Sequence, residues 1–215
     1  MKKQVLVVGL GRFGSAVART LYRMGDEVLA VDIDPHLVQN VADEVSHAVT
    51  ADATDPDVLR QLGVTDFDTA VVAIGSNLQA SILTTLNLRE CGCRYIIAKA
   101  VTAQHAKILE RVGADRVVFP EVETGVRVAH TLMARTVLDY LDLGPGYGIA
   151  VLRLPPSLTG RTVDELALSE RYKLTLIALV RGNEVQLHPR RDVRLAADTI
   201  LVVAGRDADL EAFRD

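Results

Sequence analysis

The sequence predicts an α/β chain in which a doubly wound parallel sheet is followed by a long crossover helix and a small α+β module. Three observations lead to this prediction. Short strands that are apolar throughout alternate with amphipathic helices over residues 1–120. A glycine-rich loop joins the first strand to the first helix. A segment with three glycines and one proline, residues 142–148, separates this pattern from a different one near the C-terminus.

The alternation in the N-terminal part predicts six strands and five helices. The strands are expected at residues 4–8, 27–32, 47–51, 69–74, 95–99 and 116–119. The helices are expected at residues 12–24, 35–44, 55–62, 77–90 and 102–112. Strands without polar alternation are typical of a parallel sheet that is buried on both faces. We therefore expect one Rossmann sheet, in which ligands bind at the carboxyl ends of the strands.

The loop after the first strand has the spacing G-x-G-x-x-G, with glycines at Gly9, Gly11 and Gly14. In this motif Gly9 permits a tight turn, Gly11 lets a phosphate approach the backbone, and Gly14 allows close packing of helix on strand. The N-terminus of the helix offers free N–H groups to the phosphates. Asp32, at the end of the second strand, can accept hydrogen bonds from ribose hydroxyls but would repel a 2′-phosphate. ATP, ADP, AMP or NAD(H) therefore fits better than NADP.

Other strand ends should surround the same crevice, at Asp52, Ile74, Gly75 and Lys99. Ordinary turn chemistry is the alternative interpretation of such residues. It is strong for polar side chains just before a helix, such as Asn77, and weaker for Asp52 and Lys99.

The segment 121–141 is predicted to form one helix about 30 Å long. Apolar residues recur at spacings of three or four, at Val122, Val126, Ala129, Met133, Val137 and Tyr140. Val128, Leu132 and Leu138 add a second apolar flank. One flank can cover the sheet edge, and the other would contact a partner subunit. Burial between two domains of the same chain is the alternative.

Residues 144–215 are predicted to form a small α+β module. Strands are expected at residues 149–154, 174–181, 185–188 and 199–204, and helices at residues 163–172 and 208–213. The expected division is thus a nucleotide-binding domain over residues 1–120, a helix with the start of a linker over residues 121–143, and the module over residues 144–215.

Composition excludes several classes of protein. The chain has 215 residues, 49% of them hydrophobic, and a net charge of −4. It lacks the basic excess of a nucleic-acid binder and a long apolar run that could span a membrane. The N-terminus enters a strand at once, so we expect no signal peptide and a cytoplasmic chain. The two cysteines, Cys91 and Cys93, have no neighbouring metal ligands and are expected to be reduced thiols.

The residues expected of an enzyme are missing from the predicted crevice. A nicotinamide dehydrogenase usually needs a proton donor or acceptor near the hydride. The five histidines are scattered, and none follows a strand at the predicted crevice. No G-x-S-x-G, H-E-x-x-H or Walker motif is present in the sequence. We expect a protein that is not an enzyme, and a small NAD-dependent dehydrogenase is the alternative.

Five segments resemble those of the RCK (TrkA-N/TrkA-C) family, at residues 9–14, 31–34, 51–54, 73–81 and 113–121. The resemblance covers essentially the whole chain and is greatest to the regulatory subunits of Ktr and Trk potassium uptake systems. It implies homodimers that assemble into an octameric ring, peripheral to the inner face of the membrane, beneath a potassium-translocating subunit of the KtrB or TrkH type. It also implies that ATP and ADP compete for the crevice, that ATP supports potassium flux, and that Trk relatives also bind NADH or NAD.

The same resemblance implies roles for individual residues. The expected nucleotide contacts are Gly9, Gly11, Phe13 and Gly14 at the phosphates, Asp32 with Asp34 at the ribose, Asp52 and Ala53 at the adenine, and Lys99 in the crevice. Many relatives have Asn where this chain has Asp52. Arg12 would reach the γ-phosphate bound by a neighbouring subunit. Glu121 would lie near a divalent cation at the dimer interface.

Many relatives also bind cyclic di-AMP between two C-terminal domains. Arg161, Asn183, His188 and Pro189 lie in the corresponding region of this chain. A plain dimerisation module is the alternative.

Overall fold

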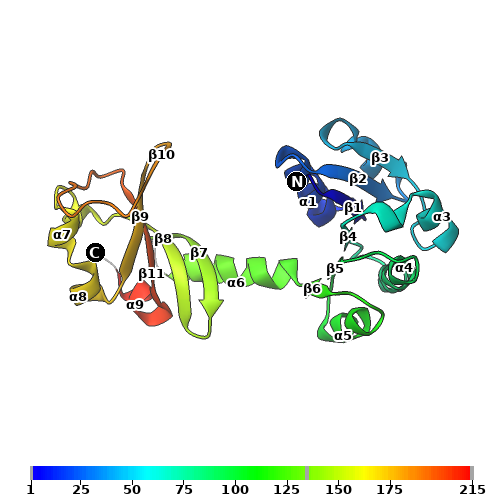
Figure 1. The fold of residues 1–215 in the computed structure, drawn as a ribbon. Coiled ribbons are helices and arrows are strands. Elements are labelled where there is room, and N and C mark those ends of the chain that lie inside the picture. The colour runs from blue at the N-terminus through cyan, green and yellow to red at the C-terminus, as the bar shows by residue number, and fades with distance from the viewer. Residues whose placement is uncertain (1, 134–135, 214–215) are drawn as a thin grey trace. The chain divides into compact units, whose positions relative to one another are not determined.

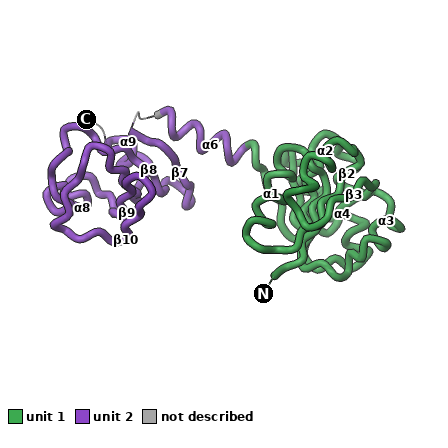
Figure 2. Tube along the Cα trace, turned by 90° about the horizontal axis from the view of Figure 1, so that it is seen from above, with its two compact units in different colours: residues 1–121 green, residues 122–215 purple. Residues whose placement is uncertain are grey.

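The computed structural model describes residues 2–133 and 136–213. The chain divides into two compact units, residues 1–121 and residues 122–215 (Figure 2). Each unit is described separately below.

Unit 1 contains the predicted parallel sheet of six strands (Figure 1). The strands are β1 (Gln4–Val8), β2 (Glu27–Asp32), β3 (His47–Thr50), β4 (Thr69–Val72), β5 (Ile96–Lys99) and β6 (Arg116–Val118). Their spatial order is β3-β2-β1-β4-β5-β6, and every neighbouring pair is parallel. This is the doubly wound Rossmann order, so the prediction of fold class is confirmed.

Helices cover both faces of this sheet. They are α1 (Arg12–Arg23), α2 (Pro35–Gln39), α3 (Pro56–Gln61), α4 (Leu78–Glu90) and α5 (Ala103–Arg111), with short 3₁₀ turns η1 (Ala42–Glu44) and η2 (Val64–Asp66). Ala18 and Val38 of α1 and α2 pack in one core. Leu59, Leu88 and Leu109 of α3, α4 and α5 pack in the other. The helix predicted over residues 35–44 is two pieces, α2 and η1.

Four of these helices begin with a side chain that accepts a hydrogen bond from a free backbone N–H. At α2 and α3 the side chains of Asp34 and Asp55 accept from the N–H groups of His36 and Asp57, both at 2.8 Å. At α4 and α5 the side chains of Asn77 and Thr102 accept from the N–H groups of Ala80 and His105, both at 3.0 Å. Such a cap stabilises a helix by about 1 kcal/mol. Helix α1 has Gly11 at this position and no side-chain cap.

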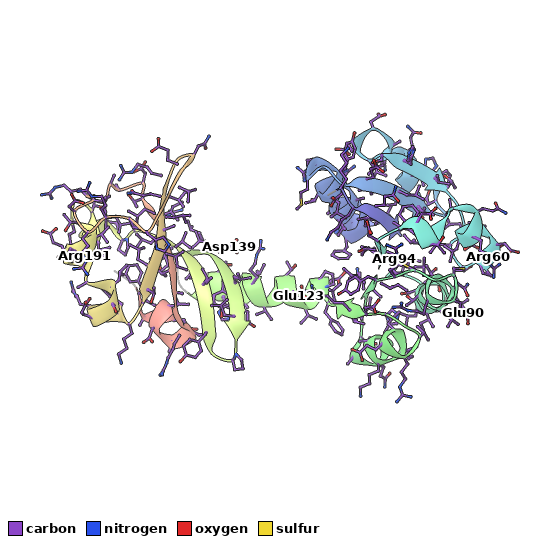
Figure 3. All side chains as sticks on the ribbon, viewed as in Figure 1. Arg60, Glu90, Arg94, Glu123, Asp139 and Arg191 are labelled. Atoms are coloured by element: carbon purple, nitrogen blue, oxygen red, sulfur yellow. The ribbon has the colours of Figure 1, made fainter. Side chains whose placement is uncertain are left out.

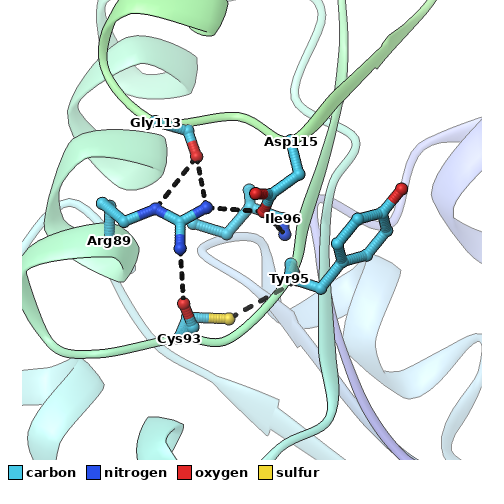
Figure 4. Close-up of polar contacts among 6 residues, drawn as sticks. All are labelled: Arg89, Cys93, Tyr95, Ile96, Gly113 and Asp115. Atoms are coloured by element: carbon cyan, nitrogen blue, oxygen red, sulfur yellow. Dashed lines mark hydrogen bonds and ion pairs between the residues drawn. The ribbon is translucent and has the colours of Figure 1, made fainter.

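Arg89 fastens the amino-terminal ends of β5 and β6 to the end of α4 (Figure 4). Its guanidinium donates to the carbonyl of Gly113 at 2.7 and 3.1 Å and to the carbonyl of Cys93 at 3.0 Å. It also pairs with Asp115 at 2.5 Å, and Asp115 accepts from the N–H of Ile96 at 2.7 Å. Gly113 has φ +110°, and a Cβ there would lie 2.8 Å from Arg89. These contacts of Arg89 therefore stabilise the amino-terminal edge of the sheet, which is opposite to the predicted crevice.

Unit 2 is built on an antiparallel sheet of five strands in the order β10-β9-β11-β8-β7. The strands are β7 (Val137–Gly144), β8 (Tyr147–Arg153), β9 (Thr175–Arg181), β10 (Glu184–Leu187) and β11 (Ile200–Arg206). The helical elements are α6 (Pro120–Met133), which begins at the end of unit 1, and η3 (Pro156–Leu158), α7 (Val163–Leu166), α8 (Leu168–Tyr172) and α9 (Asp207–Ala212). Its core includes Leu152, Leu166, Leu201 and Phe213, all fully buried.

The structure differs from the sequence prediction after residue 133. The helix predicted over residues 121–141 ends at Met133, residues 134–135 lie outside the described residues, and Val137 and Tyr140 belong to strand β7. A register shift between Val137 and Asp139 places residues three apart on the same buried face, so the spacing matched a helix. The glycines of the predicted linker form the β7–β8 hairpin, where Gly144 and Gly146 have positive φ. Strand β7 thus belongs to the C-terminal sheet.

Charged side chains lie on the outside of both units. Figure 3 shows Arg60 and Glu90 at the outside of unit 1 and Arg191 at the outside of unit 2, and all three are exposed. Arg94 lies 3.8 Å from Asp68, at the surface. No helix in the described ranges is long and apolar enough to cross a membrane.

Candidate nucleotide-binding site

The β1–α1 loop is closely packed at two of its three glycines. Gly9 has φ +91°, and a Cβ there would lie 2.9 Å from the amide nitrogen of Ile74. A Cβ on Gly14 would lie 1.8 Å from the carbonyl oxygen of Gly9. A Cβ on Gly11, in contrast, would meet nothing within 4 Å. The space beside Gly11 is where a ligand can approach the backbone.

The N-terminus of α1 is bare. Its first turn has no acidic residue, and Gly11 provides no side-chain cap. Across residues 2–133 and 136–213 no partner is found for the backbone N–H groups of Arg12, Phe13 and Gly14. Free N–H groups and the positive end of the helix dipole favour an anion at this point.

Asp32 lies against this loop. Its Oδ2 accepts from the backbone N–H of Leu10 at 2.6 Å, and its Oδ1 accepts from the N–H of Asp34 at 2.9 Å. These bonds fix the carboxylate beside the glycine loop, where it can also accept from a ribose hydroxyl. The side chain of Asp34 caps α2 through His36.

Asp52 follows β3 and is held by a short turn. Its Oδ1 accepts from the backbone N–H of Thr54 at 2.9 Å and from the hydroxyl of Thr54 at 2.7 Å. The hydrogen bond from the Thr54 hydroxyl, followed by that from its N–H, holds the pKa of Asp52 below its ordinary value. Asn87 of α4 donates to the carbonyl of Thr54 at 2.8 Å. The carboxylate is therefore ionised and fixed at neutral pH.

Lys99, the last residue of β5, carries a positive charge near the glycine loop. Its ammonium lies 2.5 Å from Oε1 of Glu121 and 6.0 Å from the centre of the Phe13 ring. A Cβ on Gly75 would lie 3.1 Å from the same ammonium, so Gly75 leaves room for it. The hydrogen bond from Lys99 lowers the pKa of Glu121.

Most of the predicted site residues lie at the carboxyl edge of the sheet. Several of them have surroundings that differ from the predicted ones. Ala53 is buried in the core. Ile74 packs beside that core. Arg12 is exposed on the first turn of α1.

The divalent cation predicted at Glu121 has no support in the geometry of this chain. The carboxylate is paired with Lys99, whose positive charge opposes a nearby cation. In the part of the chain that the structure describes, no group of three or more His, Cys, Asp or Glu side chains could hold a metal ion.

Sequence reasoning missed Thr54 and Asn87. Thr54 belongs to the segment 51–54, which resembles the RCK family, but no role was predicted for it. Asn87 had no sequence signal, because the bond to Thr54 joins residues 33 positions apart.

A separate hollow of about 520 Å³ lies at the amino-terminal edge of the sheet. Tyr22, Glu27, His47 and Phe67 are among the residues that line it. It shares no residue with the glycine loop and lies at the opposite ends of the strands. It is therefore not the predicted crevice.

The candidate residues of unit 2 lie on different elements. Arg161 precedes α7, Asn183 is in the β9–β10 turn, and His188 and Pro189 follow β10. His188 has φ +46°, and its N–H donates to the carbonyl of Ile177 at 3.1 Å.

Comparison with known families follows the same division of the chain. The TrkA-N domain model matches residues 5–120, and the TrkA-C domain model matches residues 149–215. The chain belongs to the TrkA-N/TrkA-C family. Membership confirms the resemblance that the sequence motifs indicate.

Curated relatives match over nearly the full chain. Ktr system potassium uptake protein C of Bacillus subtilis (strain 168) is 41% identical over 213 residues, covering 99% of this chain and 96% of the relative. Ktr system potassium uptake protein A of the same organism is 39% identical with the same coverage.

Solved structures of the GsuK channel share the fold. The GsuK channel bound to NAD matches with a TM-score of 0.64 and 20% identity, over 98% of this chain and 38% of that chain. GsuK bound to ADP matches with a TM-score of 0.50 and 18% identity, over 64% of this chain and 35% of that chain.

Proposed function

We propose that this chain is a nucleotide-sensing regulatory subunit of a membrane potassium uptake system, and that it is not an enzyme. The names of the two Ktr relatives support potassium uptake as its context. In this role the chain works at the cytoplasmic face of the membrane, where it forms homodimers and an octameric ring beneath a potassium-translocating subunit.

One observation carries the nucleotide part of this proposal. The bare N-terminus of α1 and the fixed carboxylate of Asp32 lie side by side at the carboxyl edge of the sheet. The free N–H groups suit phosphates, and the carboxylate suits ribose hydroxyls. An adenosine phosphate carries both phosphates and ribose hydroxyls.

The chain distinguishes ATP from ADP through Arg12. Its guanidinium is exposed, stands on the first turn of α1, and has no partner found in the described ranges. A guanidinium pairs strongly with a terminal phosphate, so a third phosphate in the same or a neighbouring subunit gives it a contact that ADP lacks. A differential contact of this kind is what shifts a conformational equilibrium. ATP and ADP would thereby favour different shapes of the ring and gate the channel subunit.

A second candidate ligand is NAD(H). The GsuK channel of similar fold was solved with NAD, and Asp32 fits the ribose of a dinucleotide equally well. The chain would then sense the nicotinamide pool in the same regulatory role. Cyclic di-AMP in unit 2 is a separate candidate, with Arg161, Asn183, His188 and Pro189 as its proposed contacts.

A thermal-shift titration of the full chain with ATP, ADP, NADH and cyclic di-AMP in parallel tests these assignments. Ligand binding raises the unfolding temperature by an amount set by concentration over Kd. We expect ATP and ADP to stabilise the native chain. Asp32→Ala should remove that shift, and Arg12→Ala should make the ATP and ADP shifts equal. Stabilisation by NADH alone would favour the second candidate, and no shift with any nucleotide would overturn the proposal.

A further inference from the structure

The hollow of about 520 Å³ at the amino-terminal edge of the sheet in unit 1 has no role in the proposed function. Its volume falls in the range of roughly 300–1,000 Å³ that is usual for small-molecule sites. We propose that this hollow binds a small organic anion, a carboxylate joined to a flat aromatic body. The inference goes beyond the proposed function, because it concerns a second ligand at the other end of the strands.

The hollow lies where strand β3 begins later than strand β2. Strand β2 begins at Glu27, but its pairing with β3 begins at Leu29 and His47. The N–H of Val28 donates to the hydroxyl of Ser46 at 3.0 Å, so it is satisfied without a bond to a strand backbone. Side chains from the end of α1, the end of α3 and the segment before β4 complete the wall. A ligand in this corner of the sheet therefore meets mainly side chains.

One part of the lining is apolar. Val28 and Leu29 are buried there, and Leu62 and Phe67 are partly buried. Tyr22, at the end of α1, is 43% exposed. An exposed ring beside buried aliphatic side chains is apolar surface that a ligand can remove from water. Aromatic rings also attract one another when they pack at suitable angles. We therefore expect the body of the ligand to be flat and aromatic.

The other part of the lining carries hydrogen-bond donors without partners. Over residues 2–133 and 136–213, no hydrogen bond or ion pair is found for the Lys2 ammonium, the His47 imidazole or the Tyr22 hydroxyl. An ammonium only donates, and a neutral imidazole and a phenol each have one hydrogen to donate. The carboxylate of Glu27 already accepts from the side-chain amide of Gln4 at 3.3 Å. The open hydrogen-bonding capacity of the hollow therefore suits an acceptor.

A carboxylate on the ligand satisfies these donors best. Its two oxygens accept several hydrogen bonds, and a bond from an ammonium is charge-assisted. A ligand amine would be repelled by Lys2, whereas an inorganic anion would leave the rings of Tyr22 and Phe67 in water. Glu27 opposes an anion, but the Gln4 amide occupies one of its oxygens. The chemistry of the lining therefore fits an aromatic carboxylate.

Saturation-transfer NMR titrations of the full chain with three probes test the proposal. Indole-3-acetate carries a ring and a carboxylate, tryptamine carries the same ring and an amine, and acetate lacks the ring. We expect indole-3-acetate to bind on the order of tenfold more tightly than tryptamine or acetate. The double variant Lys2→Gln/His47→Gln should lose on the order of tenfold in affinity for indole-3-acetate. Lys107→Gln, at an exposed lysine of α5, is the matched control and should leave that affinity unchanged.

The three substituted side chains are exposed, and the unfolding temperature of each variant checks that it folds. Equal affinities for indole-3-acetate and tryptamine, or no binding of indole-3-acetate at millimolar concentration, would overturn the inference. An affinity that the double variant leaves unchanged would also overturn it, as would displacement of indole-3-acetate by ADP, which would place the probe in the nucleotide crevice. The proposed function is tested by the nucleotide titrations alone and does not depend on these results.

Discussion

Helix α1 and the other helices of unit 1 begin in opposite ways. Helices α2, α3, α4 and α5 each start with an Asp, Asn or Thr side chain that accepts from a backbone N–H. Helix α1 starts with Gly11, has no cap and has no acidic residue in its first turn. A cap stabilises a helix where nothing else will bind. Its absence at α1 alone among the five leaves N–H groups free for the phosphates of the proposed ligand.

The first test separates the glycine that the fold requires from the glycine that the ligand requires. A Cβ on Gly14 would lie 1.8 Å from the carbonyl of Gly9, so Gly14→Ala should lower the free energy of unfolding by about 3 kcal/mol or more. Gly11→Ala is the matched control, because Gly11 has φ −62° and open space around it. Urea denaturation should show a large loss for the first variant and almost none for the second. Equal losses would mean that both glycines serve packing.

The second test converts α1 into a capped helix. Gly11→Asp places a carboxylate where the other helices have theirs, so the fold should remain at least as stable. The same carboxylate would occupy the anion position, and the affinity for ADP should fall on the order of a hundredfold, as measured by calorimetry. An affinity unchanged in this variant would place the phosphates elsewhere.

The third test removes a cap from the other class of helix. Thr102→Ala deletes the hydroxyl that accepts from His105 at the start of α5. The free energy of unfolding of this variant should be lower than that of the native chain by about 1 kcal/mol. Its affinity for ADP should stay within about twofold of the native value. A large loss of affinity would show that the capped helices also serve the ligand.

The smallest effect is expected at Glu121, whose side chain is largely exposed. Because Lys99 lowers the pKa of Glu121, the pair stabilises the folded chain above the ordinary carboxylate pKa, and this contribution is lost as pH falls through the lowered value. Glu121→Gln should therefore lower the free energy of unfolding by less than about 1 kcal/mol at neutral pH. Denaturation curves of variant and native chain should converge once the pH lies below the lowered pKa of Glu121. A difference that persists there would exclude the ion pair as its cause.

The fold of unit 1 was predictable because its strands are apolar and its turns carry strong local signals. Asn77 illustrates this point: the sequence favoured a cap, and it caps α4. The error after residue 133 came from Val137 and Tyr140, whose spacing fits a helix and a bulged strand alike. Asn87 could not be found, because its contact with Thr54 depends on how α4 packs against α3 and its loop. The local sequence pattern therefore predicts helices and strands, whereas the side chains that position a site depend on contacts between residues far apart in the sequence.

Hydrogen–deuterium exchange of the full chain with and without saturating ADP tests the central claim most directly. The claim is that the free N–H groups of Arg12, Phe13 and Gly14 bind the phosphates of the ligand. We expect exchange in a peptide over residues 9–17 to slow markedly on ADP addition, while a peptide over residues 103–111, at the capped helix α5, changes little. Calorimetry on the same sample confirms that ADP is bound. Unchanged exchange over residues 9–17 in ADP-saturated protein would contradict the account.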